Sequence, residues 1–436
     1  MRSTRKRSAP PVEYSMLLTA TLCLLAFGIV MVFSASSTTA LLGESGDGAL
    51  YLKRTVLFGA IGLAVMRVLS IKGLRAARDL TPALLALSMF LLLAVLVPGV
   101  GVEANGATRW IGVGLFQIQP SELAKVALIL YGAHLLATRP KVVEDLRTMA
   151  PYLLVCGFAC ALIVVEPDLG SGLVAAFSIA MLLVVGGAKV RHLALVAGTL
   201  TALALIAIAM EPYRQERLVG FLNPGADAAG SGFQGIQASI AMGSGGVFGV
   251  GLGESVQKAF YLPEAHTDMI AAVIGEELGL LGFLVLVGLY LLFGFAGFST
   301  ARKARDRYTK LLAAGLTSLV LLQAALNLFA VMGLAPLTGV PLPFVSYGGS
   351  SLLVTLGVVG LLLNIARGGR APARRQTRRP PALAAKLSVV DGGGETIRAR
   401  RTIPARSSRG ANGRHSGGRD RRARRARSRG RRRAAR

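Results

Sequence analysis

The stretch "LLGFLVLVGLYLLFGF", residues 280–295, contains no charged side chain. An apolar run of about 20 residues can cross a bilayer as a helix, because the hydrocarbon core is about 30 Å thick and a helix rises about 1.5 Å per residue. Similar runs recur along the 436-residue chain, which is 53% hydrophobic and 16% charged. The runs are continuous rather than alternating, which favours helices. The sequence therefore predicts an all-α polytopic membrane protein.

We expect about ten transmembrane helices, at residues 14–36, 54–71, 80–100, 120–138, 149–166, 169–188, 191–210, 268–298, 310–334 and 344–366. Residues 1–13 form a basic N-terminus that carries no convincing cleavage site for a signal peptidase. One loop, residues 211–267, is much longer than the others. The expected architecture is a ten-helix domain over residues 14–367 with one large extracellular loop.

The distribution of basic residues predicts the orientation of these helices in the membrane. With the N-terminus inside, 18 Lys and Arg fall on inner segments before the tail and six on outer segments. Cytoplasmic loops are enriched in Lys and Arg, so both termini are expected in the cytoplasm. Residues 368–436 are Arg-rich and poor in apolar residues, which predicts a disordered cytoplasmic tail. Such a tail is either simply solvated or binds anionic lipid or an acidic partner, and we expect no specific nucleic acid.

The segment "YLPEAHTDMIAAVIGEELG", residues 261–279, places carboxylates at the mouth of a membrane helix. Ionisable groups at the edge of a membrane are costly and are functional candidates. Asp268 or Thr267 could serve as a helix N-cap, but a cap needs only one carboxylate. A cluster suits a general base, a divalent cation site, or both. The members of this expected cluster are Glu264, His266, Asp268, Glu276 and Glu277.

Two arginines, Arg214 and Arg217, lie on the outer side against the general trend. A guanidinium fork matches the oxygens of a phosphate, so one interpretation is phosphate binding. The alternative is a salt bridge to Glu211 or Glu216.

Three further candidates lie in "RWIGVGLFQIQPSELAK", residues 109–125. Trp110, the only tryptophan, is either an interfacial anchor or a platform for substrate. Glu122 and Lys125 are three residues apart on a predicted helix, so they either pair with each other or leave the lysine to hold a phosphate.

Three other segments contain turn residues. "TGVPLPFVSYGGSSLL", residues 338–353, breaks the chain before the last span and is expected to line a cavity rather than only to interrupt packing. Its candidate binding residues are Ser346, Gly348, Gly349 and Ser350. "GSGGVFGVGLG", residues 243–253, lacks the pattern of a P-loop and is expected to be a flexible or close-packed loop. "VEPDLGSG", residues 165–172, is expected to be an outer turn whose acids are interfacial.

Four of these motifs together resemble the SEDS family, the shape, elongation, division and sporulation proteins FtsW, RodA and SpoVE. They are "RWIGVGLFQIQPSELAK", "EPDLGSG", "LPEAHTDMIAAVIGEELGLLG" and "PLPFVSYGGSS", and the resemblance covers residues 14–367. The segment "SVQKAFYLPEAHTD", residues 255–268, is more similar to the division branch than to the elongation branch. Met269 stands where the family usually has Phe.

The resemblance implies a peptidoglycan glycosyltransferase that polymerises lipid II at the outer face of the bacterial cytoplasmic membrane, at the division septum. It implies that Asp268 is the essential catalytic residue and that Trp110 and Lys125 match family motif positions. We expect Asp268 to act as general base. We expect Arg214, Arg217 and Lys125 to stabilise the pyrophosphate leaving group.

The resemblance also implies a divalent cation, Mg²⁺ or Mn²⁺, and no organic cofactor. It further implies a class B penicillin-binding transpeptidase and other divisome proteins as partners. Two alternative functions remain, a lipid II flippase and a scaffold that recruits the penicillin-binding protein. A flippase would favour a binding site near the midplane, whereas the acids gather on one side.

Overall fold

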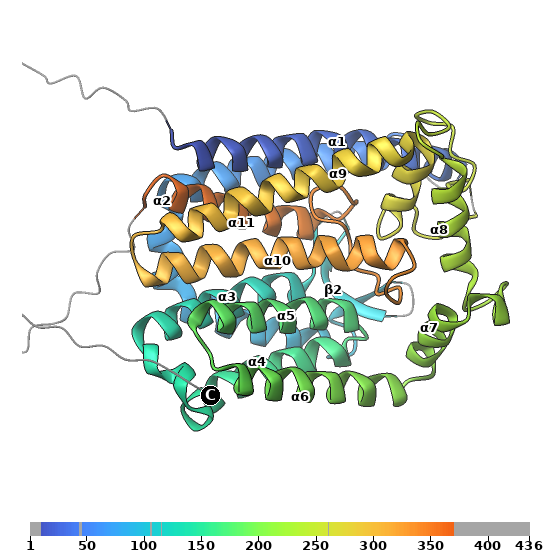
Figure 1. Cartoon of the computed structure of the whole chain (residues 1–436). Coiled ribbons are helices and arrows are strands. Elements are labelled where there is room, and N and C mark those ends of the chain that lie inside the picture. Colours follow the sequence, from blue (N-terminus) through green and yellow to red (C-terminus); the bar gives the residue numbers. More distant parts are fainter. Residues whose placement is uncertain (1–9, 43–45, 105–106, 115, 260, 370–436) are drawn as a thin grey trace, which may run out of the picture. The chain divides into compact units, whose positions relative to one another are not determined.

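The computed structural model describes residues 10–42, 46–104, 107–114, 116–259 and 261–369. The expected tail lies outside these residues, apart from its first two positions. The long helices are α1 (Val12–Leu42), α2 (Leu50–Val95), α3 (Pro120–Thr138), α4 (Leu146–Val165), α5 (Leu169–Gly186), α6 (Val190–Ala209), α9 (Ile270–Lys303), α10 (Arg307–Val331) and α11 (Gly349–Ala366). They pack side by side in one bundle (Figure 1).

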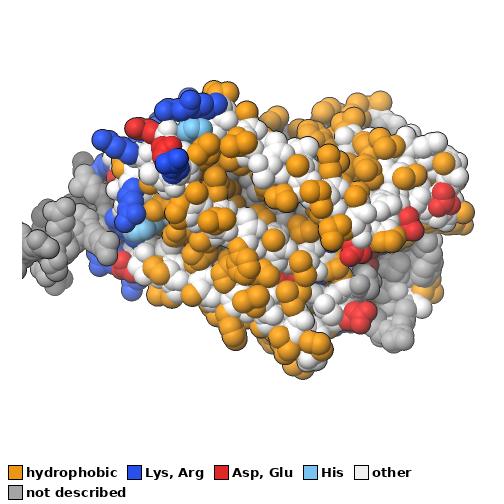
Figure 2. Space-filling model, turned by 90° about the horizontal axis from the view of Figure 1, so that it is seen from below, with side chains coloured by type: hydrophobic (Ala, Val, Ile, Leu, Met, Phe, Trp, Pro, Cys, Tyr) orange, Lys and Arg blue, Asp and Glu red, His pale blue; other side chains and the backbone are white. Residues whose placement is uncertain are grey.

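The bundle is built to cross a membrane. Within the described part of the chain, eight helices are long and apolar enough to span a bilayer. The other long helix, α3, contains the buried pair Glu122 and Lys125. Figure 2 shows apolar side chains over the middle of one face, with Lys and Arg gathered at one end beside a few Asp and Glu, and Asp and Glu without Lys or Arg at the other end. This distribution confirms a polytopic helical membrane protein.

Helix α2 covers two of the ten predicted spans, 54–71 and 80–100. A straight helix of its 46 residues would measure about 69 Å, roughly twice the thickness of the hydrocarbon core. Figure 1 shows that α2 changes direction at the left of the view. Near this region Asn364 Nδ2 of α11 donates hydrogen bonds to the carbonyls of Leu69 and Ser70, each at 3.1 Å. The last turn of α11 is thereby fixed to α2.

A small sheet follows α2, which the all-α expectation missed. Strands β1 (Gly101–Ala104), β2 (Ala107–Val113) and β3 (Phe116–Ile118) pair antiparallel in the order β1-β2-β3. Trp110 lies in β2 opposite Val102 of β1. The hairpins are short, and a three-residue strand gives too brief an alternation to be recognised between two membrane helices.

The outer loop 211–267 contains more regular structure than expected. It includes α7 (Pro212–Leu222), a 3₁₀ turn (Pro224–Asp227) and α8 (Phe233–Ser244). Pro212 and Pro224 each stand at the first position of their element, where proline is well tolerated. The loop is therefore a folded segment, and its helices α7 and α8 lie at one end of the bundle (Figure 1).

Helix α9 is broken, where a continuous span was expected. Gly279 has φ +64° and ψ −162°, outside the helical region. The glycine-rich segment inserts at this break, which agrees with the close-packed interpretation. Four backbone hydrogen bonds join the two, from Val250 N to Glu276 O, from Gly251 N to Glu277 O, from Leu280 N to Gly246 O and from Leu281 N to Val247 O, at 2.9–3.1 Å. The inserted segment thus satisfies the backbone groups that the broken helix leaves unpaired.

Candidate active site

Asp268 lies just before α9, at the end of the bundle opposite the start of α1. The helix begins at Ile270 with Met269 as its N-cap, so neither Asp268 nor Thr267 serves as the cap. Asn327 Nδ2 of α10 donates to the carbonyl of Asp268 at 2.7 Å and to the carbonyl of Val340 at 2.8 Å. This amide fixes the backbone of Asp268 against the segment before α11. The half-buried carboxylate is left for another role.

The surroundings of Asp268 favour a basic carboxylate. Burial and the neighbouring Glu264 raise the pKa of Asp268 to about 6, and Arg217 opposes that shift. Thr267 Oγ1 lies 2.7 Å from Glu264 Oε2 and 3.3 Å from Asp268 Oδ1, so its hydroxyl links the two acids. Glu264 has φ +56°, a strained conformation for a residue other than glycine. A carboxylate with this pKa is suited to proton abstraction near neutral pH.

Only one of the two outer arginines lies beside Asp268. A β-carbon added to Gly339 would lie 3.8 Å from Asp268 Oδ2 and 3.9 Å from Arg217 Nη1, so both groups face the same glycine. Arg217 Nη1 also donates to the carbonyl of Leu337 at 3.0 Å, and the guanidinium lies 4.6 Å from the Tyr213 ring centroid.

Arg214 has a structural position instead. Its guanidinium donates to the carbonyls of Ala207 at 2.8 Å and Val164 at 2.7 Å, so it fastens α7 to α6 and α4. Among the described residues, neither Arg214 nor Arg217 forms a salt bridge to Glu211 or Glu216. The salt bridge that was the predicted alternative to phosphate binding is therefore not found in the described part of the chain.

His266 connects the Asp268 segment to the chain break before α11. Its ring lies 4.4 Å from the ring of Tyr51 and 5.6 Å from that of Tyr347, centroid to centroid. Its carbonyl accepts a hydrogen bond from Tyr347 N at 2.9 Å. Burial lowers the pKa of His266 and Glu264 opposes the shift, so the imidazole is mainly neutral at pH 7. The sequence predictions omitted Tyr51, whose only signal is a polar aromatic residue at the start of an apolar run.

The predicted residues of the 338–353 segment shape the backbone. Ser346 Oγ accepts a hydrogen bond from Leu342 N at 2.8 Å, and Gly348 is the N-cap of α11. A β-carbon on Gly349 would lie 2.8 Å from the Phe58 ring. Ser350 Oγ is buried without a partner in the described part of the molecule. These positions close a bend between α10 and α11 next to Asp268.

Glu122 and Lys125 form the ion pair that was one of the two alternatives for them. Lys125 Nζ lies 2.9 Å from Glu122 Oε1 and 3.0 Å from Gln323 Oε1, and all three side chains are buried. Gln323 precedes Asn327 by one turn of α10, so this pair lies one turn deeper than the amide that holds Asp268. Lys125 therefore sits beneath the site and supports it.

Trp110 lies in β2, and this strand is hydrogen-bonded to the "EPDLGSG" turn through Arg109. The adjacent Arg109 donates to the carbonyl of Glu166 at 3.2 Å and to that of Pro167. Asp168 caps α5 through a bond from Ser171 N to its Oδ1 at 3.0 Å. Trp110 is half-buried on β2.

The expected carboxylate cluster divides into two groups, which corrects the prediction of a single site. Glu277 forms a buried salt bridge to Lys258 at 2.7 Å and accepts a hydrogen bond from Ser34. Glu276 accepts from Ser255 Oγ at 2.5 Å and from Val256 N at 3.0 Å. These two acids anchor the outer loop. Only Glu264 and His266 remain near Asp268.

The space around Asp268 is small and offers few metal ligands. A pocket of about 170 Å³ is lined by Asp268, Asn327, Thr338 and Gly339, among others. No group of three or more His, Cys, Asp and Glu that could hold a metal ion occurs within the described ranges.

Comparison with known proteins extends these observations. Residues 14–371 match the family model FtsW/RodA/SpoVE, described as cell cycle protein. Stage V sporulation protein E of Bacillus subtilis is 39% identical over 84% of this chain and 100% of its own length. A probable peptidoglycan glycosyltransferase FtsW of Geobacter metallireducens is 42% identical over 78% of this chain and 90% of its own.

Solved structures show the same fold. A chain from a peptidoglycan synthase complex that coordinates polymerization and crosslinking superposes with a TM-score of 0.66 at 32% identity, over 80% of this chain and 96% of that one. The rod shape determining protein RodA of Thermus thermophilus superposes with a TM-score of 0.60 at 30% identity, over 80% of this chain and 95% of that one. The chain therefore belongs to the FtsW, RodA and SpoVE family of cell cycle proteins.

Proposed function

We propose that this chain is a peptidoglycan glycosyltransferase that polymerises lipid II into glycan strands during cell division. The observation that carries the proposal is the carboxylate of Asp268, whose pKa is about 6 and which lies beside Arg217 at the outer end of the bundle. Relatives named as probable peptidoglycan glycosyltransferase support the reaction class. The lipid part of the substrate would lie along the apolar helices.

The reaction needs a base and a charge stabiliser. The 4-hydroxyl oxygen of the acceptor GlcNAc attacks the anomeric carbon of the donor MurNAc, and its proton passes to Asp268. The bond from that carbon to the polyprenyl pyrophosphate breaks, and the pyrophosphate takes the electron pair. Arg217 faces the same glycine as Asp268 and would stabilise this anion. Arg214 and Lys125, by contrast, support the fold through their buried partners.

The neutral His266 and the two tyrosine rings beside it would orient the sugar. Aromatic faces bind apolar surfaces of a ligand while their polar tips stay wet. Tyr51 and Tyr347 are half-buried, and the rings of both contact His266. His266 lies two residues before Asp268 in the sequence. Trp110 would extend this surface from the sheet.

A divalent cation stays a prediction from the family resemblance. The described residues offer no cluster of protein ligands for Mg²⁺ or Mn²⁺, so we assign none and no step depends on the ion. Loss of activity on adding EDTA, restored by Mg²⁺ or Mn²⁺, would support a cation that the substrate helps to bind.

The chain is a multi-pass membrane protein, and we propose its orientation and partner as well. The Lys- and Arg-rich end faces the cytoplasm, and the end with Asp268 faces outward. The similarity to a chain of a peptidoglycan synthase complex supports a class B penicillin-binding transpeptidase as partner. The relatives named FtsW support localisation at the septum, with other divisome proteins as partners.

The test is polymer formation from purified lipid II by the detergent-solubilised chain together with its transpeptidase. The proposal predicts glycan strands from the wild-type complex. No glycan from a folded complex, together with lipid II translocation in proteoliposomes, would overturn it in favour of a flippase. No activity of either kind, with the transpeptidase still recruited, would favour a scaffold.

A further inference from the structure

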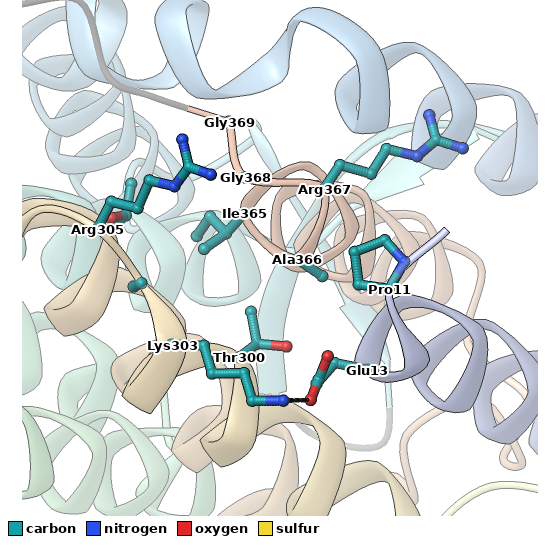
Figure 3. A pocket seen from close by; sticks show the side chains of 12 residues that line it. Pro11, Glu13, Thr300, Lys303, Arg305, Ile365, Ala366, Arg367, Gly368 and Gly369 are labelled. Carbon is teal, nitrogen blue, oxygen red and sulfur yellow. Dashed lines mark hydrogen bonds and ion pairs between the residues drawn. The ribbon is translucent and has the colours of Figure 1, made fainter. Parts of the chain in front are cut away.

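A pocket opens at the Lys- and Arg-rich end of the bundle, far along the helices from Asp268. It is a hollow of about 660 Å³ that is open to solvent. The start of α1, the end of α9, the start of α10 and the end of α11 surround it (Figure 3). The lining residues are Pro11, Glu13, Thr300, Lys303, Ala304, Arg305, Thr309, Ile365, Ala366, Arg367, Gly368 and Gly369.

The pocket has three basic side chains and one acid. Lys303 pairs with Glu13, and the exposed fractions of these side chains are 69% and 13%. Arg367 lies 4.2 Å from the Tyr14 ring centroid and donates to the Tyr14 hydroxyl at 2.6 Å. Arg305 is exposed and has no partner among the described residues. Figure 3 shows its guanidinium extending over the pocket toward Gly368. The pocket therefore offers uncompensated positive charge.

The helix ends around the pocket do not cancel this charge. Carbonyls at a helix C-terminus carry partial negative charge and would repel an anion. Some of these carbonyls are occupied by hydrogen bonds, because Ala304 N donates to Ala301 O at 3.3 Å, and Gly368 N donates to Ile365 O at 2.8 Å. Gly369 N likewise donates to Asn364 O at 3.1 Å. The start of α1, on the opposite wall, contributes the favourable end of a helix dipole.

The remaining lining is partly apolar, and an exposed apolar side chain lies next to it in the sequence. Pro11, Ala304, Ile365 and Ala366 line the pocket beside the basic side chains. Val12, at the first turn of α1, is 69% exposed. A ligand that fits both walls has a phosphate at one end and an apolar body at the other. Basic pockets between transmembrane helices on the cytoplasmic side bind anionic lipid headgroups in this way.

We propose that this pocket binds the phosphate headgroup of an anionic phospholipid from the cytoplasmic leaflet. Arg305 is the phosphate ligand, and Arg367, which is held by the Tyr14 hydroxyl, adds positive charge to the lining. Glu13 competes with the phosphate for Lys303. The site is separate from Asp268, and the proposal uses the proposed orientation but not the transferase activity.

Native mass spectrometry of the detergent-purified full chain tests the proposal. The probe is phosphatidylglycerol, with phosphatidylcholine and glycerol 3-phosphate in separate titrations. Arg305→Gln is compared with Arg302→Gln, which removes the same charge three residues earlier, in the last turn of α9 and outside the pocket. One basic group near the membrane surface lowers the dissociation constant of an anionic lipid about fivefold. Arg305→Gln should raise the dissociation constant of the first bound phosphatidylglycerol molecule about fivefold, and Arg302→Gln should leave this constant unchanged.

Glu13→Gln supplies a test in the opposite direction. It frees Lys303 and removes the competing carboxylate, so phosphatidylglycerol should bind more tightly, and phosphatidylcholine should bind weakly to every variant. Equal weakening by Arg302→Gln and Arg305→Gln would overturn the site in favour of diffuse attraction to the basic face. Binding of glycerol 3-phosphate as tight as that of phosphatidylglycerol would overturn the lipid in favour of a soluble phosphate. All three variants change exposed side chains or an exposed ion pair and should fold.

Discussion

At the residue scale, the proposed chemistry depends on one carboxylate and its neighbours. The motif "HTD" could be identified from the sequence, but the separation of its neighbours could not. Glu276 and Glu277 lie close to Asp268 in sequence, and only the fold shows that Ser255 and Lys258 bind them. Helical spacing predicts contacts between residues three or four apart, so it cannot predict partners about 20 residues away along a loop. The same limit applied to the arginines, whose backbone acceptors are not encoded locally.

The pH dependence of activity should respond to Glu264. A base with a pKa of about 6 is deprotonated and active above that pH, so kcat/KM should fall as the pH drops through 6. The charge of Glu264 raises this pKa, so Glu264→Gln should lower it and move the acidic limb to lower pH. Glu254→Gln, an exposed acid of the same loop, is the control for net charge. An unmoved limb in Glu264→Gln would argue against Asp268 as the titrating base.

The two outer arginines should separate in function. Arg217→Gln removes the cation beside Asp268 and should lower kcat by about 10²-fold, the usual effect of losing one electrostatic stabiliser. Arg214→Gln removes two bonds between helices and should mainly lower Tm. Steady-state kinetics and thermal unfolding measure the two effects. A larger loss of kcat in Arg214→Gln than in Arg217→Gln would contradict this assignment.

At the element scale, the outer half of the molecule departs most from the sequence predictions. The apolar run 268–298 indicated one continuous helix, because Gly279 alone is a weak signal within such a run. The break is stable only because residues 246–251 supply backbone partners, and such a non-local contact leaves no periodic pattern. The sheet at residues 101–118 was missed for a related reason. Its strands are short and stand between two strongly apolar segments.

Glycines in the inserted segment give a matched stability test. Gly249 and Gly253 both have positive φ, +82° and +91°. A β-carbon on Gly249 would lie 2.1 Å from Glu277 O, whereas one on Gly253 would meet nothing within 4 Å. Gly253→Ala should therefore cost only the backbone strain, about 1–2 kcal/mol. Gly249→Ala should cost about 1–3 kcal/mol more through the clash. Equal Tm values for the two variants would show that the segment is not inserted at the break.

At the scale of the whole molecule, the sequence predicted the architecture more accurately than it predicted single elements or contacts. Long uncharged runs and the bias of Lys and Arg predicted the helical bundle and the separation of charge that Figure 2 shows. These properties depend on composition summed over many residues, so single errors of boundary have little effect. Helix α2 illustrates the limit. Its two spans were recognised, but the absence of a loop between them was not.

The orientation can be tested with two introduced thiols. Glu216→Cys lies exposed on α7 at the outer end, and Arg302→Cys lies exposed in the last turn of α9 at the other end. A membrane-impermeant maleimide should label the first in intact spheroplasts and the second only after permeabilisation. The reverse pattern would place Asp268 in the cytoplasm and remove the basis for synthesis at the outer face.

The most direct measurement is glycan formation from lipid II by the transpeptidase complex carrying Asp268→Asn. The amide keeps the shape of the side chain but cannot accept the proton, so no glycan should form while Tm and lipid II binding remain near wild type. Asp47→Asn, which alters an exposed aspartate, should retain activity. Glycan formed at the wild-type rate by folded Asp268→Asn would contradict the claim that this carboxylate is the base.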